Sequence, residues 1–269
     1  MTSCTPRGCS AADPGPPGRV RLSLVVITLN EARTIGRCLD SVSDLADEML
    51  VVDSGSTDST RELAAARGVR VLEREFDNYG AQKQFALEQA RGEWILCLDA
   101  DEWLDATARD AVADLVDEPP PSEICGFRQR MRVCYLGRWL RYGLLSGERK
   151  LRLVRWGCAR WSPDTVHESL RLKSGRLEDL PGNILHEPYR DLSHQLSKIN
   201  RYTDLIAKRD SHLSAYRVWF GVLMEPPLVF LHAYVLRMGF LDNRQGFLAA
   251  ATHAFYFFVR YAKIRQRQG

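Results

Sequence analysis

Short apolar runs and stretches with helical spacing alternate along the first hundred residues of the chain. Four runs rich in β-branched residues are typical of strands buried on both faces: Leu22–Leu29, Met49–Val52, Val69–Leu72 and Trp94–Leu98. Between them, apolar residues recur at helical spacing in 34–45, 59–67 and 79–90. This alternation predicts an α/β fold with a mostly parallel central sheet, right-handed crossovers and helices on both faces.

The pattern changes after residue 104. An amphipathic helix is predicted over 105–117, and 124–186 contains short strand-like pieces separated by Gly and Arg, typical of antiparallel strands and loops. Residues 191–209 are helical, and 216–262 form the most apolar part of the chain. There we expect Glu225-Pro226-Pro227 and Gly239 to break the helix. A C-terminal helical appendage follows from this pattern.

These changes divide the chain into three expected parts. Residues 1–20 are rich in Pro and Gly and lack the apolar segment of a signal peptide, so we expect a disordered lead-in and a cytoplasmic protein. Residues 21–190 form the α/β domain, with halves 21–118 and 119–190, and residues 191–269 form the helical region. The seven cysteines include no CxxC pair, so neither a disulfide framework nor a zinc site is expected.

The net charge of +3 conceals a division of charge along the chain. Residues 30–118 hold 9 basic and 21 acidic residues, a net charge of −12, whereas 119–180 carries +7 and 181–269 carries +6. Such asymmetry indicates that the two halves meet different partners. No nucleic-acid-binding motif accompanies the basic residues, so nucleic acid is not an expected partner.

Polar residues follow three of the predicted strands. Their segments are Thr28-Leu29-Asn30-Glu31, Asp53-Ser54-Gly55 and Asp99-Ala100-Asp101. Because ligands bind at the carboxyl ends of parallel strands, we expect the three segments to converge on one site. Two carboxylates at i and i+2 suit a divalent cation that also takes phosphate oxygens, although an acidic turn that caps the next helix has the same pattern.

Other metal and phosphate motifs do not fit. The loop Asp53–Asp58 lacks the Gly-Lys-Ser/Thr of a P-loop; either it binds phosphate as a Gly-containing loop before a helix, or Asp58 caps that helix. Asp53 suits a hydrogen bond to a base or ribose. Neither His167-Glu168 nor His186-Glu187 begins an HExxH motif, which excludes a zincin site.

The segments 25–31, 51–58 and 94–102 together resemble the family 2 glycosyltransferases, which have the GT-A fold. Further segments resemble the branch with the lipopolysaccharide-core β-1,4-glucosyltransferases: 149–155, 160–168, 184–186, 198–202 and 239–242. The resemblance runs from about residue 22 to 263. It implies inverting, metal-dependent transfer of a hexose, with UDP-glucose favoured as donor, to a glycolipid or oligosaccharide of the cell envelope.

The resemblance also implies roles for individual residues. The nucleotide-sugar donor would lie against Thr28, Asn30, Glu31, Asp53, Lys83, Asp99 and Ala100, with Lys83 at the donor phosphates. Mg²⁺ or Mn²⁺ would bind Asp101, with Asp99 and His186 as further candidate ligands. Solvated or structural positions remain the alternatives for Lys83 and His186.

Inversion needs a base that takes the proton of the acceptor hydroxyl. Glu168 is the leading candidate, His167 would orient it or contact phosphate, and Asp164 is the reserve. In the basic segment 149–155, strand alternation places Arg149, Leu151 and Leu153 on one face and Lys150, Arg152 and Val154 on the other. That basic face either holds an anionic ligand or is simply solvated.

The C-terminal region has aromatic faces that end in Arg260, Lys263, Arg265 and Arg267. No run of 18 uncharged apolar residues occurs, so we expect helices that lie on the inner-membrane surface rather than a span. Packing on the α/β domain or on a second subunit is the alternative. Rival functions are transfer to a polyisoprenyl phosphate or a peptide side chain, a nucleotidyltransferase, and a non-catalytic sugar-nucleotide-binding module.

Overall fold

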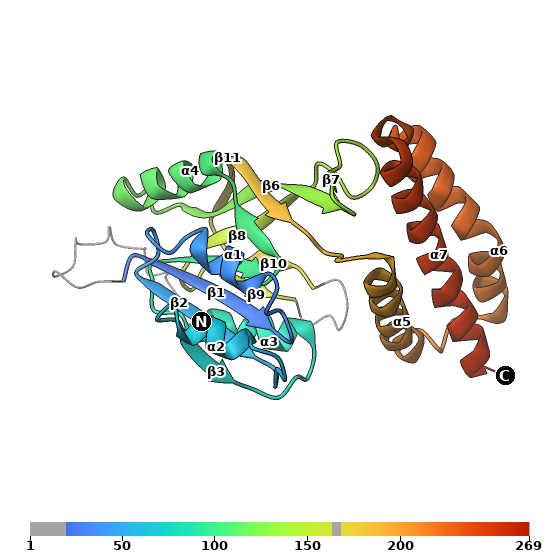
Figure 1. Cartoon of the computed structure of the whole chain (residues 1–269), viewed down its shortest axis with the longest axis horizontal. Helices are drawn as coiled ribbons and strands as arrows, with labels where there is room; N and C mark the ends of the chain where they lie inside the picture. Colours follow the sequence, from blue (N-terminus) through green and yellow to red (C-terminus); the bar gives the residue numbers. More distant parts are fainter. Residues whose placement is uncertain (1–19, 163–167, 269) are drawn as a thin grey trace, which may run out of the picture.

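The computed structural model describes residues 20–162 and 168–268, which form an α/β domain and a helical region beside it (Figure 1). The central sheet has the strand order β3-β2-β1-β4-β8-β6-β11-β5, with β7 paired to β6. Its first half contains β1 (Leu22–Thr28), β2 (Glu48–Asp53), β3 (Arg70–Glu73) and β4 (Trp94–Asp99), with helices α1 (Ile35–Asp40), α2 (Thr60–Ala65) and α3 (Tyr79–Gln89). These four strands are parallel, which confirms the predicted sheet.

Apolar side chains cover both faces of β1. Leu24 and Val26 belong to a core cluster that includes residues of α1, whereas Val25 packs with Ala86 and Leu87 of α3. Because both faces are buried, only the ends of the strand are accessible to a ligand. Residues of this half of the sheet that bind or react with a ligand are therefore expected in the loops at the carboxyl ends of its strands.

The second half of the sheet is mixed. It contains β5 (Glu102–Leu104), β6 (Ile124–Tyr135), β7 (Arg138–Trp139), β8 (Arg149–Arg155) and β11 (Arg176–His186), with α4 (Ala106–Asp117) and a separate pair, β9 (Ala159–Trp161) and β10 (Leu170–Leu172). Strand β8 is antiparallel to β4 and β6, as expected. Strands β6 and β11 run parallel, so the expectation of antiparallel strands is wrong for this pair. After β6 the chain passes through β8, β9 and β10, and it begins β11 at the end of the sheet where β6 begins.

A bulge in β8 changes which side chains share a face. In its pairing with β6, Leu153 lies opposite Phe127 and Leu151 lies opposite Arg128, so Arg152 is the additional residue. Simple alternation, which places Leu151 and Leu153 on one face, is therefore wrong: the two leucines pack in clusters on opposite sides of the sheet. Arg152 is buried instead of solvated.

The helical region consists of α5 (Leu192–Arg209), α6 (Ala215–Leu231) and α7 (Asn243–Gln268), with the π-helix η1 (His232–Leu236) and the 3-10 helix η2 (Gly239–Asp242) between α6 and α7. Figure 1 shows α6 and α7 side by side, with α5 between them and the sheet. The helix does end near Gly239, as predicted: Met238 before it has a positive φ of 54°.

The predicted break at Glu225-Pro226-Pro227 is wrong, because α6 continues through all three residues. The two prolines remove backbone donors, but the Glu225 carboxylate accepts hydrogen bonds from Arg217 and from Tyr261 of α7, which hold this part of the helix in place. The continuous stretch Ala215–Leu236 is long and apolar enough to cross a membrane by length and composition, and only 17% of its 18-residue apolar window is buried. The expected interruption therefore does not by itself argue against a span.

A partly buried ion pair joins the C-terminal end of α5 to α7. The Asp210 carboxylate accepts hydrogen bonds from Arg209 and from Arg260 of α7, and these bonds hold the pKa of Asp210 below its usual 3.8. We expect Asp210→Asn to lower the free energy of unfolding by about 1–3 kcal/mol at pH 7 in urea denaturation. Because the folded-state pKa is the lower one, this stabilisation is present above pH 3.8 and disappears as the pH falls through the folded-state pKa.

The control for this prediction is Asp114→Asn, at an exposed position of α4, which should change stability by less than about 0.5 kcal/mol. An equal loss in both variants, or a difference that persists in strong acid, would contradict the prediction.

Candidate active site

Three polar loops meet at the carboxyl ends of the parallel strands. The register of the sheet places Thr28 of β1 opposite Asp53 of β2, and Ile27 opposite Asp99 of β4. The strand pairing itself therefore brings the sequence-predicted segments together. Ala100 is buried directly after Asp99.

The Asp53 loop is organised by its own side chains. The Asp53 carboxylate is fully buried and accepts hydrogen bonds from the backbone N–H groups of Gly55 and Ser56, at 3.0 and 2.8 Å. Asn30, with a positive φ of 58°, accepts a hydrogen bond from the Thr57 N–H. Asp53 and Asn30 thus shape the rim of the site. The prediction that Asp58 caps α2 is wrong by one position: the N-cap residue is Ser59, and Asp58, one residue earlier, accepts a hydrogen bond from the Thr60 N–H.

Thr28 and Glu31 differ from these loop-forming residues. The buried Thr28 hydroxyl has no hydrogen-bond partner within the part of the chain that the structure describes. The Glu31 carboxylate accepts from the Thr34 hydroxyl, and its pKa is raised by burial first and by the negative charge of Asp101 second. Thr28 therefore places a buried, unpaired hydroxyl at the end of β1.

Asp99 lies between two cations. Its Oδ1 is 2.7 Å from the Lys83 Nζ of α3, and its Oδ2 is 2.9 Å from the Arg152 Nη2 of β8. Lys83 also reaches Glu168, 2.8 Å away, and Arg152 reaches Glu102, 2.6 Å away. One continuous network therefore connects the end of β4 to Glu168, the predicted base, which lies two residues before β10.

This network fixes the charge of its members. Burial alone would raise the pKa of Asp99, but Lys83 and Arg152 hold it well below its usual range. Burial would lower the pKa of Lys83, yet Asp99 and Glu168 raise it above its usual value although the positive charge of Arg152 opposes them. Both groups therefore stay charged near neutral pH. The Trp161 ring, 4.8 Å from the Lys83 Nζ, covers the ammonium group.

Asp101 has its own basic neighbours. Its Oδ1 is 3.3 Å from the His186 Nε2 at the end of β11, and its Oδ2 is 3.6 Å from the Lys198 Nζ of α5. Burial opposes ionisation of Asp101, but the charge of His186 lowers the carboxyl pKa; burial likewise opposes the imidazolium, but Asp101 raises the His186 pKa. The structure thus brings together two residues predicted as metal ligands.

Asp101 and His186 fit Mg²⁺ or Mn²⁺ as a partial ligand set. Their close approach offers a carboxylate oxygen and an imidazole nitrogen, donors that Mn²⁺ accepts. Within 20–162 and 168–268, no three His, Cys, Asp or Glu side chains are grouped so as to hold a metal ion. Further ligands would come from a diphosphate and water, as is usual for phosphate-bound Mg²⁺. Asp99, by contrast, is engaged by Lys83 and Arg152.

One cation of the site was missed from the sequence, and another was placed differently. Arg152 was predicted on a basic strand face that either holds an anionic ligand or is solvated, whereas the bulge of β8 brings it to Asp99. Lys198 lies in the helical region, and its helical spacing carries no sign of its contact with Asp101. The predicted base candidates His167 and Asp164 lie outside the described residues. The cysteines Cys38 and Cys97 are buried and free, and burial raises the pKa of Cys97 to about 12, so its thiol is inert.

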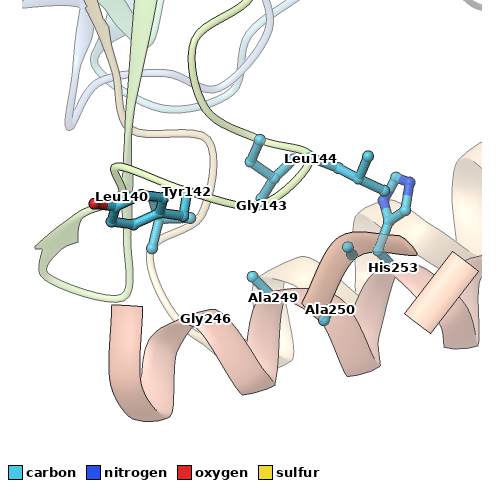
Figure 2. A pocket seen from close by; sticks show the side chains of 10 residues that line it. Leu140, Tyr142, Gly143, Leu144, Gly246, Ala249, Ala250 and His253 are labelled. Carbon is cyan, nitrogen blue, oxygen red and sulfur yellow. The ribbon is translucent and has the colours of Figure 1, made fainter. Parts of the chain in front are cut away.

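An apolar pocket lies apart from this polar site. Figure 2 shows it between the loop Leu140–Leu144 and the start of α7, where Gly246, Ala249 and Ala250 line one side. His253 lies at its end. None of its lining residues carries a carboxylate. The pocket therefore lies at the contact between the α/β domain and the helical region and is separate from the polar site.

The chain has clear relatives among known proteins. The model of the family Glycosyl transferase family 2 matches residues 23–167. The lipopolysaccharide core biosynthesis glycosyltransferase LpsC of Rhizobium meliloti (strain 1021) is 32% identical over 255 residues, covering 93% of each chain. An uncharacterized glycosyltransferase of Rickettsia prowazekii (strain Madrid E) is 27% identical over 258 residues, covering 91% of this chain and 87% of the relative.

Among solved structures, the mannosyltransferase PcManGT from Pyrobaculum calidifontis, in complex with GDP-Man and Mn²⁺, matches 98% of this chain and 92% of its own. The TM-score is 0.52 at 17% sequence identity, so this likeness bears on the fold alone.

Proposed function

The chain belongs to glycosyl transferase family 2, and from that premise we propose that it transfers a hexose to a saccharide of the lipopolysaccharide core. The proposed donor is UDP-glucose, and the proposed outcome at the anomeric carbon is inversion. The acceptor class is supported by LpsC, which covers 93% of the chain. The observation that carries the proposal is the pair of carboxylates at the end of β4, each facing basic side chains.

The donor would lie across the carboxyl ends of β1, β2 and β4. The nucleoside would lie beside Thr28, whose buried hydroxyl has no hydrogen-bond partner among the described residues, and the loop shaped by Asp53 and Asn30 would form the rim. Asp101 and His186 would hold Mg²⁺ or Mn²⁺, which supplies positive charge for the departing diphosphate. Lys83, Arg152 and Lys198 add fixed positive charge from three different elements.

Transfer would proceed by a single displacement. A bond forms between the acceptor hydroxyl oxygen and the anomeric carbon, while the bond from that carbon to the diphosphate oxygen breaks. The acceptor proton would pass to the Glu168 carboxylate, and the electron pair of the breaking bond leaves with the diphosphate. The Lys83 ammonium, 2.8 Å from Glu168, orients this carboxylate toward the site.

We expect Glu168→Gln to reduce the turnover number by about 10²–10⁴-fold, because the amide cannot take the proton. Donor affinity, measured by isothermal titration with UDP-glucose, should stay close to that of the wild type. The control is Glu148→Gln, at an exposed position outside the network, which should retain normal turnover. Normal turnover in Glu168→Gln would move the role of the base to Asp164 or His167.

The experiment that tests the function incubates the full chain with UDP-glucose, Mn²⁺ and a soluble lipopolysaccharide-core oligosaccharide. We expect the acceptor to gain the mass of one hexose, and NMR of the product to show an inverted anomeric centre. Parallel reactions offer GDP and ADP sugars, a polyisoprenyl phosphate and a peptide. Transfer only to one of these last two acceptors would refute the core acceptor, and donor binding without any transfer would indicate a non-catalytic module.

A further inference from the structure

The outer side of α6 is a continuous apolar stripe. Seven large side chains recur along it at helical spacing and are 42–82% exposed: Tyr216, Trp219, Phe220, Leu223, Met224, Leu228 and Leu231. The inner side is different, because Val218 and Gly221 are buried against α7, and a Cβ on Gly221 would come within 2.5 Å of the Tyr261 ring. Helix α6 thus packs on one side only, and soluble monomers rarely leave an apolar area of this size in water.

The stripe continues beyond α6 into the segment Val235–Leu241, which we call the tip. Five of its side chains are at least 44% exposed: Val235, Leu236, Met238, Phe240 and Leu241. The tip has a fixed shape, because the Asp242 carboxylate accepts hydrogen bonds from the backbone N–H groups of Arg141 and Tyr142. The fold therefore holds these apolar groups in the exposed position.

The charges around the stripe have one sign. Residues 211–268 contain seven basic and two acidic residues. Both acids are used internally: Glu225 binds Arg217 and Tyr261, and Asp242 is buried under the tip. Arg237 and Arg244 are exposed on either side of Phe240 and Leu241. Three of the seven basic residues form ion pairs: Arg217 with Glu225, Arg260 with Asp210, and Lys263 with Asp204. This surface therefore combines apolar and aromatic side chains with the positive charge of Arg237 and Arg244.

We propose that the stripe and the tip dock on an anionic lipid leaflet, with α6 lying in the plane of the interface. An apolar helix face, interfacial Trp and Tyr, and flanking Arg are together typical of helices that lie on an anionic membrane surface. A second copy of the chain fits less well, because its identical face would set Arg237 and Arg244 against like charges. The inference rests on the proposed function in one respect: a glycolipid acceptor would lie in the same leaflet, on the cytoplasmic side.

Docking in the plane follows from the contacts of α6 with α7. If α6 crossed the bilayer, the Glu225 bonds to Arg217 and Tyr261 would enter the hydrocarbon or break. The close packing of Gly221 on Tyr261 would also have to separate or take α7 along. In-plane docking leaves all these contacts intact and buries the stripe.

The test is flotation of the full-length protein with vesicles of phosphatidylcholine alone or with phosphatidylglycerol. We expect binding to the anionic vesicles, weaker binding at high salt, and little binding to neutral vesicles. The double variant Leu223→Glu, Leu231→Glu should bind at least about 100-fold more weakly, because it removes two exposed leucines from the apolar face. The matched control, Trp156→Glu with Leu177→Glu, changes two exposed apolar residues of the α/β domain and should bind like the wild type.

Three results would overturn the proposal. One is equal vesicle binding by the wild type and the stripe variant, or none by either. Another is a dimer in light scattering that the stripe variant dissociates, and the third is resistance of the bound protein to carbonate extraction, which indicates a span. Transfer to a soluble oligosaccharide should be normal in the stripe variant, so loss of docking and failure of the proposed function are distinguished.

Discussion

Asp101→Ala is expected to reduce the turnover number by at least about 10²-fold and to remove the effect of Mn²⁺ on donor affinity. The Asp101 carboxylate, just after β4, lies 3.3 Å from His186 and 3.6 Å from Lys198, where it would supply an oxygen ligand beside an imidazole. Without it, His186 and Lys198 would face the proposed donor diphosphate with no carboxylate between them to position a cation. Initial rates and calorimetric titration of UDP with and without Mn²⁺ measure both effects.

The control for Asp101→Ala is Asp110→Ala, an exposed position on α4 that should leave rate and affinity unchanged. The folded state is checked by circular dichroism and thermal unfolding. Near-normal turnover in Asp101→Ala, with Mn²⁺ still required, would refute the assignment of Asp101 as a metal ligand.

Arg152→Met is expected to lower the free energy of unfolding by about 3–5 kcal/mol. Arg152 is buried and neutralises both Asp99 and Glu102, and the Glu102 side chain is only 1% exposed. Its removal leaves a buried carboxylate without a cation, which is far more costly than the loss of a surface pair. Urea denaturation measures the change, and turnover should also fall because Asp99 loses one of its two partners.

Two variants make this prediction specific. Arg149→Met alters the same strand at an exposed position and should cost less than about 1 kcal/mol. The double variant Arg152→Met, Glu102→Met also removes the Glu102 carboxylate, which Arg152→Met alone leaves without a cation. It should therefore recover part of the lost free energy of unfolding. If Arg152→Met costs no more than Arg149→Met, the buried network does not stabilise the fold.

The parallel half of the sheet was predictable because each of its strands is buried on both faces. A continuous apolar run such as Leu22–Leu29 is typical of a strand buried on both faces. The alternating order of strands and helices then places the carboxyl ends of the strands at the same edge of the sheet. The positions of Thr28, Asp53 and Asp99 follow from that order alone. The roles of these residues in binding and catalysis stay predictions until the variants are measured.

The second half was less predictable because its geometry depends on partners distant in sequence. The bulge at Arg152 arises from the register with β6, which no local pattern in 149–155 encodes. Likewise, α6 runs through Pro226 and Pro227, where local propensity alone gives a break. Tyr261 of α7 binds the Glu225 carboxylate beside them, a tertiary contact that the local sequence does not encode.

Helix α5 contacts both the active-site loop after β4 and helix α7. Near its middle, Lys198 reaches Asp101, while Asn200 accepts a hydrogen bond from Lys263 of α7. A chain shortened at residue 190 would keep every strand of the sheet and still lose a cation of the site. The α/β domain and the helical region are therefore not interchangeable modules: a chimera that exchanges the C-terminal part must carry α5 with the sheet.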